Sequence, residues 1–156
     1  MAALELKVVG EVPGDLDLAP LEAVIGMAVT RAEELELPEG VVNLAFGDDE
    51  AVRVLNREHA GNDYATDVLS FSYLETGGAI DGVIGEMIIS LDTAARQADV
   101  AETPLGVEVA LLALHGLLHI SGYDHQNDAE RARIEAIQSD IMVTSGYTYR
   151  DFKWEK

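Results

Sequence analysis

Residues 105–125 read LGVEVALLALHGLLHISGYDH, and this segment contains both the longest apolar helical stretch of the chain and three of its four histidines. Thr103-Pro104 is typical of a helix start, and apolar residues then continue at helical spacing to about Ser121. Gly122 can end the helix because glycine readily adopts a left-handed conformation. The segment therefore predicts one long helix followed at once by a turn.

The histidine spacing within this segment predicts a metal site. Residues four apart lie on one face of a helix, with Cβ atoms about 5–6 Å apart, so His115 and His119 can converge on one ion at the zinc–nitrogen distance of about 2.0–2.1 Å. A turn at Gly122 allows His125 to return as a third ligand. Three neutral imidazoles leave one coordination position open for water, which is the arrangement of catalytic zinc. The alternative is a set of unrelated histidines on a core helix and its cap.

The same spacing, His-x-x-x-His-x-x-Gly-x-x-His, occurs in metzincin proteases. Those enzymes carry a glutamate directly after the first histidine, where it acts as the general base. The corresponding residue here is Gly116, which has no side chain. A zinc-dependent peptidase-like hydrolase therefore has its metal ligands in this sequence but lacks its base, and it is retained as an alternative.

The rest of the chain predicts short strands and helices around this segment. Residue patterns predict strands over 4–12, 41–46, 66–73 and 83–90, and helices over 18–37, 48–61, 90–100, 105–121 and 128–144. The expected fold class is α+β (mixed α/β): a single compact domain over residues 1–156, with a sheet of about four strands packed with about five helices. Its metal site would lie at a helix C-terminus and the following loop, as in zincins. The strand over 83–90 is mostly apolar, so we expect it to be covered on both faces.

The composition restricts the possible partners. The chain has 10 Lys and Arg against 29 Asp and Glu, a formal net charge of −19. Such a surface repels a polyanion, so any nucleic-acid role must rest on a local site, a bound cation or a partner protein. The absence of cysteine excludes disulfides, thiol nucleophiles and cysteine-based zinc sites. No apolar run approaches the ~18–20 residues of a membrane span and no signal peptide is evident, so a cytoplasmic location is expected.

The string from His115 to His125 resembles the YbeY family of bacterial metal-dependent endoribonucleases. The resemblance extends to Leu55-Asn56-Arg57, to the strand over 66–71 and to residues 85–94, and so covers most of the chain. It implies a cytoplasmic, single-strand-directed endoribonuclease with one Zn2+ per chain, held by His115, His119 and His125. It also implies a role in ribosomal RNA processing, at the 3′ end of the small-subunit RNA, and in ribosome quality control.

The partners that we expect follow from the resemblance and the charge together. The substrate would be ribosomal RNA, presented by a ribosomal particle or a protein partner because the acidic surface disfavours free RNA. Neither DNA nor a membrane is expected as a partner. A further alternative is a non-catalytic ribosome-associated module in which the metal is structural.

One difference from the family concerns phosphate binding. Many members have Arg-Gly-Lys-Asp before the strand over 66–71, with that arginine facing the metal cleft, whereas this chain has Ala60-Gly61-Asn62-Asp63. A guanidinium in that position suits a phosphate because it can donate two parallel hydrogen bonds. Arg57, one helical turn earlier, is the candidate replacement. The alternative is that Arg57 is a solvated helix residue.

Two acidic residues are candidates for catalysis. Glu86 lies within an apolar strand, where an unpaired carboxylate is costly to bury. It either orients a histidine ligand, acts as the general base, or pairs with an arginine such as Arg96. Asp124 directly precedes His125 and is either a second candidate base, an orienting acceptor or a loop acid.

Three further residues are candidates for the substrate cleft. His59 either serves as a proton donor, a role suited to histidine because a free imidazole has a pKa near 6.5, or is a surface or packing residue. Asp67 and Ser70 lie on the predicted strand over 66–73 and either contact a nucleotide or play local roles. In the local interpretation Asp67 caps the strand and Ser70 is buried and hydrogen-bonded.

Overall fold

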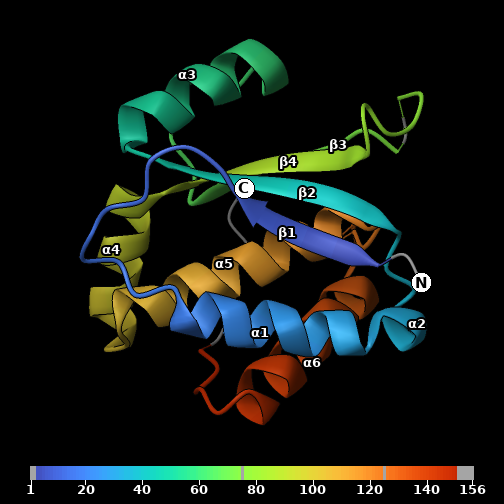
Figure 1. Cartoon of the computed structure of the whole chain (residues 1–156). Helices are drawn as coiled ribbons and strands as arrows, with labels where there is room; N and C mark the ends of the chain where they lie inside the picture. Colours follow the sequence, from blue (N-terminus) through green and yellow to red (C-terminus); the bar gives the residue numbers. More distant parts are fainter. Residues whose placement is uncertain (1–2, 75, 125, 151–156) are drawn as a thin grey trace.

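A computed structural model describes residues 3–74, 76–124 and 126–150 (Figure 1). Its four-stranded mixed sheet has the order β1-β2-β4-β3. The strands β1 (Leu4–Val8), β2 (Gly40–Gly47) and β4 (Val83–Ser90) are parallel, and β3 (Val68–Ser72) runs antiparallel to β4 at the edge. The predicted fold class and the four predicted strands are confirmed.

The described residues form six helices, one more than the sequence predicts. They are α1 (Ala19–Thr30), α2 (Ala32–Leu35), α3 (Asp49–Ala60), α4 (Leu91–Ala101), α5 (Leu105–Ile120) and α6 (Asp128–Thr144). None of these helices has by itself both the length and the apolar composition needed to cross a bilayer.

Two of the predicted boundaries are wrong. The single helix expected over 18–37 breaks at Arg31, whose φ of −106° and ψ of 22° leave the helical region. The hydroxyl of Thr30 donates to the Met27 carbonyl at 2.7 Å, a side-chain bond that competes with the helical ladder. The first strand ends at Val8 instead of residue 12, because Gly10 has a φ of +76° that extended backbone does not adopt.

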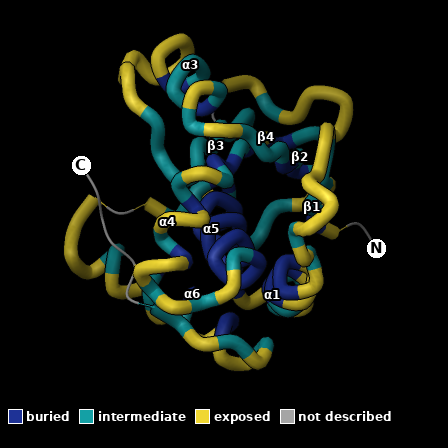
Figure 2. The backbone as a smooth tube through the Cα atoms, turned by 90° about the vertical axis from the view of Figure 1, so that its left-hand side faces the viewer, coloured by how far each residue is buried: buried dark blue, intermediate teal, exposed yellow. Residues whose placement is uncertain are grey.

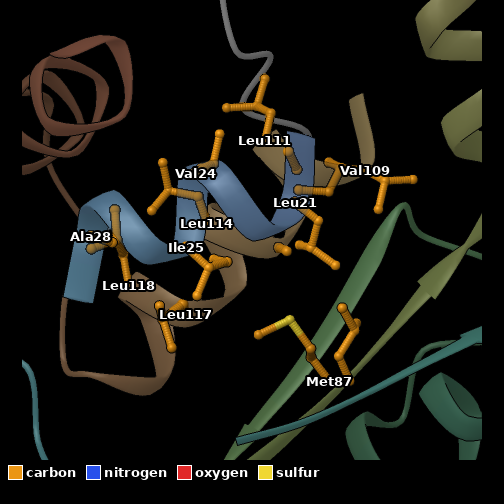
Figure 3. Packing of buried hydrophobic residues seen from close by; sticks show 14 of the residues in the cluster. Leu21, Val24, Ile25, Ala28, Met87, Val109, Leu111, Leu114, Leu117 and Leu118 are labelled. Carbon is orange, nitrogen blue, oxygen red and sulfur yellow. The ribbon is translucent and has the colours of Figure 1, made fainter. Parts of the chain in front are cut away.

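Helix α5 forms the centre of the core. All of its residues except Leu105 and His119 are buried, and the helix runs through the middle of the molecule (Figure 2). Leucines of α5 meet apolar side chains of α1 on one side, while Met87 of β4 projects from the sheet (Figure 3). A helix that is apolar on all sides is typical of a core element, so the other helices and the sheet bury its surface.

Two glycines allow α5 to lie directly on the sheet. A Cβ atom on Gly85 of β4 would stand 2.7 Å from Ile120 Cγ2 and 2.8 Å from the Phe71 carbonyl oxygen. A Cβ atom on Gly116 of α5 would stand 3.0 Å from Met87 Sδ. Residue 116 therefore faces the sheet.

The two faces of the sheet are covered unequally. Side chains alternate along a strand, so Gly85 and Met87 face α5 while Glu86 projects from the opposite face. Among the described helices, α3 lies over that outer face and covers part of it (Figure 1). The expectation that β4 is covered on both faces is therefore wrong at Glu86, which is exposed.

The segment after α6 is fixed to α5 by a buried ion pair. Arg150 donates from Nε to Glu108 Oε1 at 2.8 Å and from Nη2 to Oε2 at 2.5 Å. The Glu108 side chain is only 1% exposed, so this carboxylate depends on Arg150 for compensation of its charge. The contact brings Arg150 alongside the first turn of α5.

Candidate metal centre

His115 and His119 lie one turn apart near the C-terminus of α5, and their rings converge. The Nε2 atoms are 2.9 Å apart, and the ring centroids are 4.4 Å apart with the planes at 77°. A tetrahedral ion with bonds of 2.0–2.1 Å would hold two nitrogens about 3.3–3.4 Å apart. The two rings therefore need to move apart only slightly to hold an ion between their Nε2 atoms. Their role as metal ligands stays a prediction.

A buried glutamine fixes the orientation of the His115 ring. Gln138 of α6 has no exposed surface, and its Oε1 lies 2.7 Å from His115 Nδ1. The Gln138 amide nitrogen donates to the Tyr149 hydroxyl at 3.1 Å, so Oε1 is the atom left to face the ring. Because an amide oxygen only accepts, the proton of His115 lies on Nδ1 and the lone pair of Nε2 points toward His119. Metal-binding histidines commonly have such an acceptor behind them.

The sequence analysis missed Gln138, although the sequence contains a signal for it. The residue lies four positions after Ile134 and three before Ile141, on the face of α6 that both isoleucines bury. A polar side chain within a buried helical stripe requires a hydrogen-bond partner. Spacing alone could have indicated a buried polar contact, but it could not have indicated that the partner is His115.

The described residues supply two of the three predicted ligands. His125 lies outside the described residues, and within them no group of three or more His, Cys, Asp or Glu side chains is placed to hold a metal ion. Two neutral imidazole nitrogens are donors that zinc prefers. The pair therefore fits a zinc ion that takes a further ligand from elsewhere. The left-handed Gly122 (φ +111°) ends α5 at the predicted turn.

Tyr123, in the loop that follows α5, contacts two other elements of the structure. The Tyr123 hydroxyl donates to the Leu35 carbonyl at 2.7 Å, and the Arg133 guanidinium lies 5.0 Å from the centre of the Tyr123 ring. Asp124, the candidate base, is exposed in this loop. Its carboxylate is thus in the segment next to the histidine pair, where a role in proton transfer stays a prediction.

The structure places Glu86 and His59 away from the histidine pair. Glu86 lines a cleft on the outer face of the sheet, and His59 packs edge-on against Phe71 in the same cleft, with ring centroids 5.4 Å apart. The interpretation that Glu86 orients a histidine ligand or serves as its base is wrong, because the sheet lies between them. The suggested pair with Arg96 is also wrong, since Arg96 binds Asp49 at 2.9 Å.

The carboxylate of Glu86 has a different neighbour. Burial, together with a hydrogen bond to Glu86 and the charge of that carboxylate, raises the pKa of the Tyr73 hydroxyl above its ordinary value. Tyr73 follows β3 and lines the same cleft.

Arg57 is likewise not brought to the metal centre. It is exposed on α3, which lies on the face of the sheet away from α5 (Figure 1). Its charge lowers the pKa of Glu50, although Arg53 has the larger effect on that carboxylate. The interpretation of Arg57 as a solvated helix residue therefore fits the structure, and the interpretation as a replacement for the missing arginine does not.

The two β3 candidates have different surroundings. Asp67 accepts from the Val68 amide at 2.7 Å and from Gln97 Nε2 at 3.2 Å, so it caps the start of the strand. Ser70 shares the α5-facing side of β3 with Ser72, whose hydroxyl donates to the Ile120 carbonyl at 3.2 Å. Of the cleft candidates, Ser70 thus lies on the same face of the sheet as the histidine pair.

The position of Gly116 bears on the peptidase alternative. This residue follows His115, where a metzincin carries its glutamate, but it faces Met87 and the sheet. A glutamate side chain there would be directed against Met87 and Val68 of the sheet. The peptidase interpretation thus lacks the base, and the position that would carry it faces the sheet.

Comparison with known proteins gives consistent results. The family model described as Endoribonuclease YbeY matches residues 15–146. Proteins named Endoribonuclease YbeY include one from Pelotomaculum thermopropionicum, 38% identical over 130 residues, which covers 78% of this chain and 86% of that protein. One from Rhizobium meliloti is 33% identical over 157 residues and covers 94% of both.

A solved structure supports the fold. The solution structure of a protein from Thermotoga maritima matches with a TM-score of 0.58 and covers 89% of this chain and 90% of that one. The two sequences are 20% identical, so this likeness shows the fold alone.

Proposed function

This chain belongs to the Endoribonuclease YbeY family, and from this premise we propose that it hydrolyses RNA phosphodiester bonds at a zinc centre built on His115 and His119. The third ligand in this proposal is His125. The observation that carries it is the convergence of the two Nε2 atoms, 2.9 Å apart, with Gln138 behind His115. The substrate we propose is single-stranded ribosomal RNA during maturation of the small-subunit 3′ end and ribosome quality control.

The protein supplies orientation and proton positions at this centre. A bound zinc ion would lower the pKa of a water molecule and stabilise negative charge on the phosphate oxygens. Gln138 keeps the His115 proton on Nδ1, so that Nε2 stays available as a donor of electrons. Asp124, in the adjoining loop, is the proposed acceptor of the proton that the attacking water loses. Ser70 projects from β3 on the same face of the sheet as the histidine pair and can donate a hydrogen bond to the RNA.

The charge of the chain affects how RNA reaches this centre. At least four arginines are already paired with carboxylates: Arg31 with Asp140, Arg53 with Glu50 and Asp63, Arg96 with Asp49, and Arg150 with Glu108. These pairs reduce the positive charge available to phosphates on a chain with a net charge of −19. We therefore propose that a ribosomal particle or protein partner presents the RNA.

The test combines metal analysis with cleavage of a single-stranded RNA. We expect the wild type to contain about one zinc per chain, and His115→Ala and His119→Ala to lose both the metal and the cleavage. A chelator should abolish cleavage and added zinc should restore it. His59→Ala is the matched control for metal content, because it removes a histidine on the other face of the sheet and should leave the zinc in place.

Two outcomes would contradict the proposal. One is a wild-type protein without stoichiometric transition metal, and the other is cleavage that survives the loss of both histidines. A purely structural metal predicts a different pattern, in which His115→Ala lowers Tm and leaves any cleavage unchanged.

A further inference from the structure

The outer face of the sheet contains a cleft that the proposed reaction does not use. It has a volume of about 420 Å3 and lies between α3 and the strands β2, β3 and β4. Its walls and floor are mostly apolar, with a few polar groups; the side chains that matter here are Asn43, His59, Phe71, Tyr73 and Glu86. Such a combination is typical of sites for small or planar ligands.

The register of the strands brings these side chains together. Asn43 of β2 is the neighbour of Glu86 in β4, and Glu86 is in turn the neighbour of Phe71 in β3. Tyr73 comes directly after β3 and lines the same cleft as Phe71. Adjoining strands therefore hold an amide, a carboxylate and the Phe71 ring side by side in the cleft, and Tyr73 adds a second aromatic ring just beyond β3.

The aromatic rings suit a nucleobase. Bases of single-stranded RNA stack on aromatic side chains of a sheet, and the stacking is a contact to the base and not to the phosphate. A contact to the base matters here because the chain carries a net charge of −19, which disfavours contacts to phosphates. His59 packs edge-on against Phe71, with planes at 67°, and forms the wall on the α3 side.

The carboxylate favours one base over the others. An ionised carboxylate only accepts hydrogen bonds and can accept two parallel ones. Guanine has two adjacent donors, N1–H and the N2 amino group, whereas adenine, cytosine and uracil each offer one donor on that edge. We propose that this cleft binds one unpaired guanine of the RNA substrate, stacked on Phe71 and Tyr73 with its donor edge on Glu86.

The position of β3 connects this cleft with the candidate metal centre. Phe71 faces the outer cleft, while Ser70 and Ser72 on the same strand face α5. The strand is at the edge of the sheet, so an RNA that crosses this edge can extend from the outer cleft toward the side on which α5 lies. The inference rests on the proposed function, because it assigns a base of the same substrate to a second contact.

The experiment measures binding of RNA pentamers to the full chain carrying His119→Ala, so that the RNA is not cleaved during the titration. The pentamers are all-uridine or carry a single central guanine or adenine. We expect the guanine pentamer to bind about tenfold more tightly than the other two, as a bidentate contact to one base provides. Glu86→Ala should abolish this preference, and Tyr73→Ala should weaken binding of all three pentamers.

The matched control is Glu5→Ala, which removes an exposed carboxylate from β1 outside the cleft and should leave the guanine preference unchanged. Equal binding of the three pentamers, or a preference that survives Glu86→Ala, would overturn the inference. Cleavage by the wild type, measured in parallel, separates the two proposals. Cleavage without guanine preference refutes only the cleft, and guanine preference without any cleavage refutes only the nuclease.

Discussion

The His115 ring is held by contacts on both of its nitrogens. Gln138 accepts from Nδ1 at 2.7 Å, and His119 lies 2.9 Å from Nε2. His115 is only 7% exposed, so its orientation is set within the protein and not by solvent. A ligand that is oriented before the metal arrives loses little conformational freedom on binding. A residue such as Gln138, which does not itself bind the metal, can therefore raise the affinity for the metal.

Replacing Gln138 should therefore weaken the metal site without removing a ligand. We expect Gln138→Leu to reduce zinc affinity about 10–100-fold, as loss of such a supporting contact commonly does, and to destabilise the metal-free fold by about 1–3 kcal/mol because the buried Nδ1–H loses its acceptor. Competition with a chromophoric chelator measures the affinity.

The conservative variant for this prediction is Gln138→Glu, whose carboxylate still accepts from Nδ1 and should retain the metal. Equal zinc affinity in Gln138→Leu and the wild type would show that this glutamine does not position His115.

The spacing of His115 and His119 could be predicted from the sequence because both residues belong to one helix, whose geometry is regular. The contact with Gln138 could not, because it depends on how α6 docks against α5. The position of Glu86 could not be predicted either, for the same reason. The sequence identified an acid within an apolar strand, but only the position of α5 shows which face of the strand that acid occupies.

At the scale of the elements, the packing of the fold depends on close contact between α5 and the sheet. Gly85 leaves space for the Ile120 side chain of α5 and Gly116 leaves space for the Met87 side chain of β4, so the helix packs closely on the sheet. Helix starts and ends, by contrast, are local. Asp48 accepts from the Ala51 amide at 2.8 Å, and Gly61 with φ +77° ends the same helix, as the sequence predicts.

Gly85→Ala should disrupt this contact. The added Cβ would meet the Phe71 carbonyl oxygen, which cannot move without the strand, so we expect a loss of about 1–3 kcal/mol in the free energy of unfolding. Gly26→Ala is the matched control: this exposed residue of α1 has nothing within 4 Å of the added atom, and the change should stabilise by about 0.5–1 kcal/mol. Urea denaturation measures both, and equal stability of the two variants would contradict the prediction.

The junction of α3 and α4 predicts a pH dependence. Asp49 accepts from Ser90 Oγ at 2.6 Å, from Thr93 Oγ1 at 2.7 Å and from Arg96 at 2.9 Å. These hydrogen bonds, that from Ser90 first, lower the pKa of Asp49 from 3.8 to about 2. A lowered pKa means that the stabilisation is complete above the unfolded-state pKa near 3.9 and is lost as pH falls toward 2.

The free energy of unfolding of Asp49→Asn should therefore fall less than that of the wild type as the pH is lowered from about 4 to 2. We expect a contribution of about 1 kcal/mol, because solvent screens a carboxylate that is partly exposed. Urea denaturation of both proteins across this range measures it. Asp15→Asn, which removes the same charge from an exposed loop, is the control, and an identical pH profile for the Asp49 and Asp15 variants would refute the assignment.

At the scale of the whole molecule, charge determines which RNA interactions are open to the chain. The net charge of −19 and the pairing of arginines with carboxylates limit contacts to the phosphate backbone. The composition predicts this property without any structure. The arrangement of two separate surfaces on opposite faces of one sheet is not visible in composition or motif, because it arises from which helices cover which face.

The salt dependence of RNA binding should therefore be shallow. A protein that neutralises 6–10 phosphates loses about 10³–10⁵ in affinity between 50 and 200 mM salt. We expect a change of less than about tenfold for this chain with a single-stranded RNA, measured by fluorescence anisotropy with zinc held constant. The same titration with an uncharged-backbone analogue of the RNA is the control, and a steep loss of affinity with salt would contradict the prediction.

The alternation of side chains along β3 has an evolutionary consequence. Neighbouring residues of this edge strand serve opposite surfaces, Ser70 toward α5 and Phe71 toward the outer cleft. A single inserted or deleted codon between Val68 and Ser72 would exchange the two sets and damage both surfaces at once. Descendants of this chain are thus free to vary β3 by substitution while its length is held constant, and length polymorphism is expected in the turn between β3 and β4 instead.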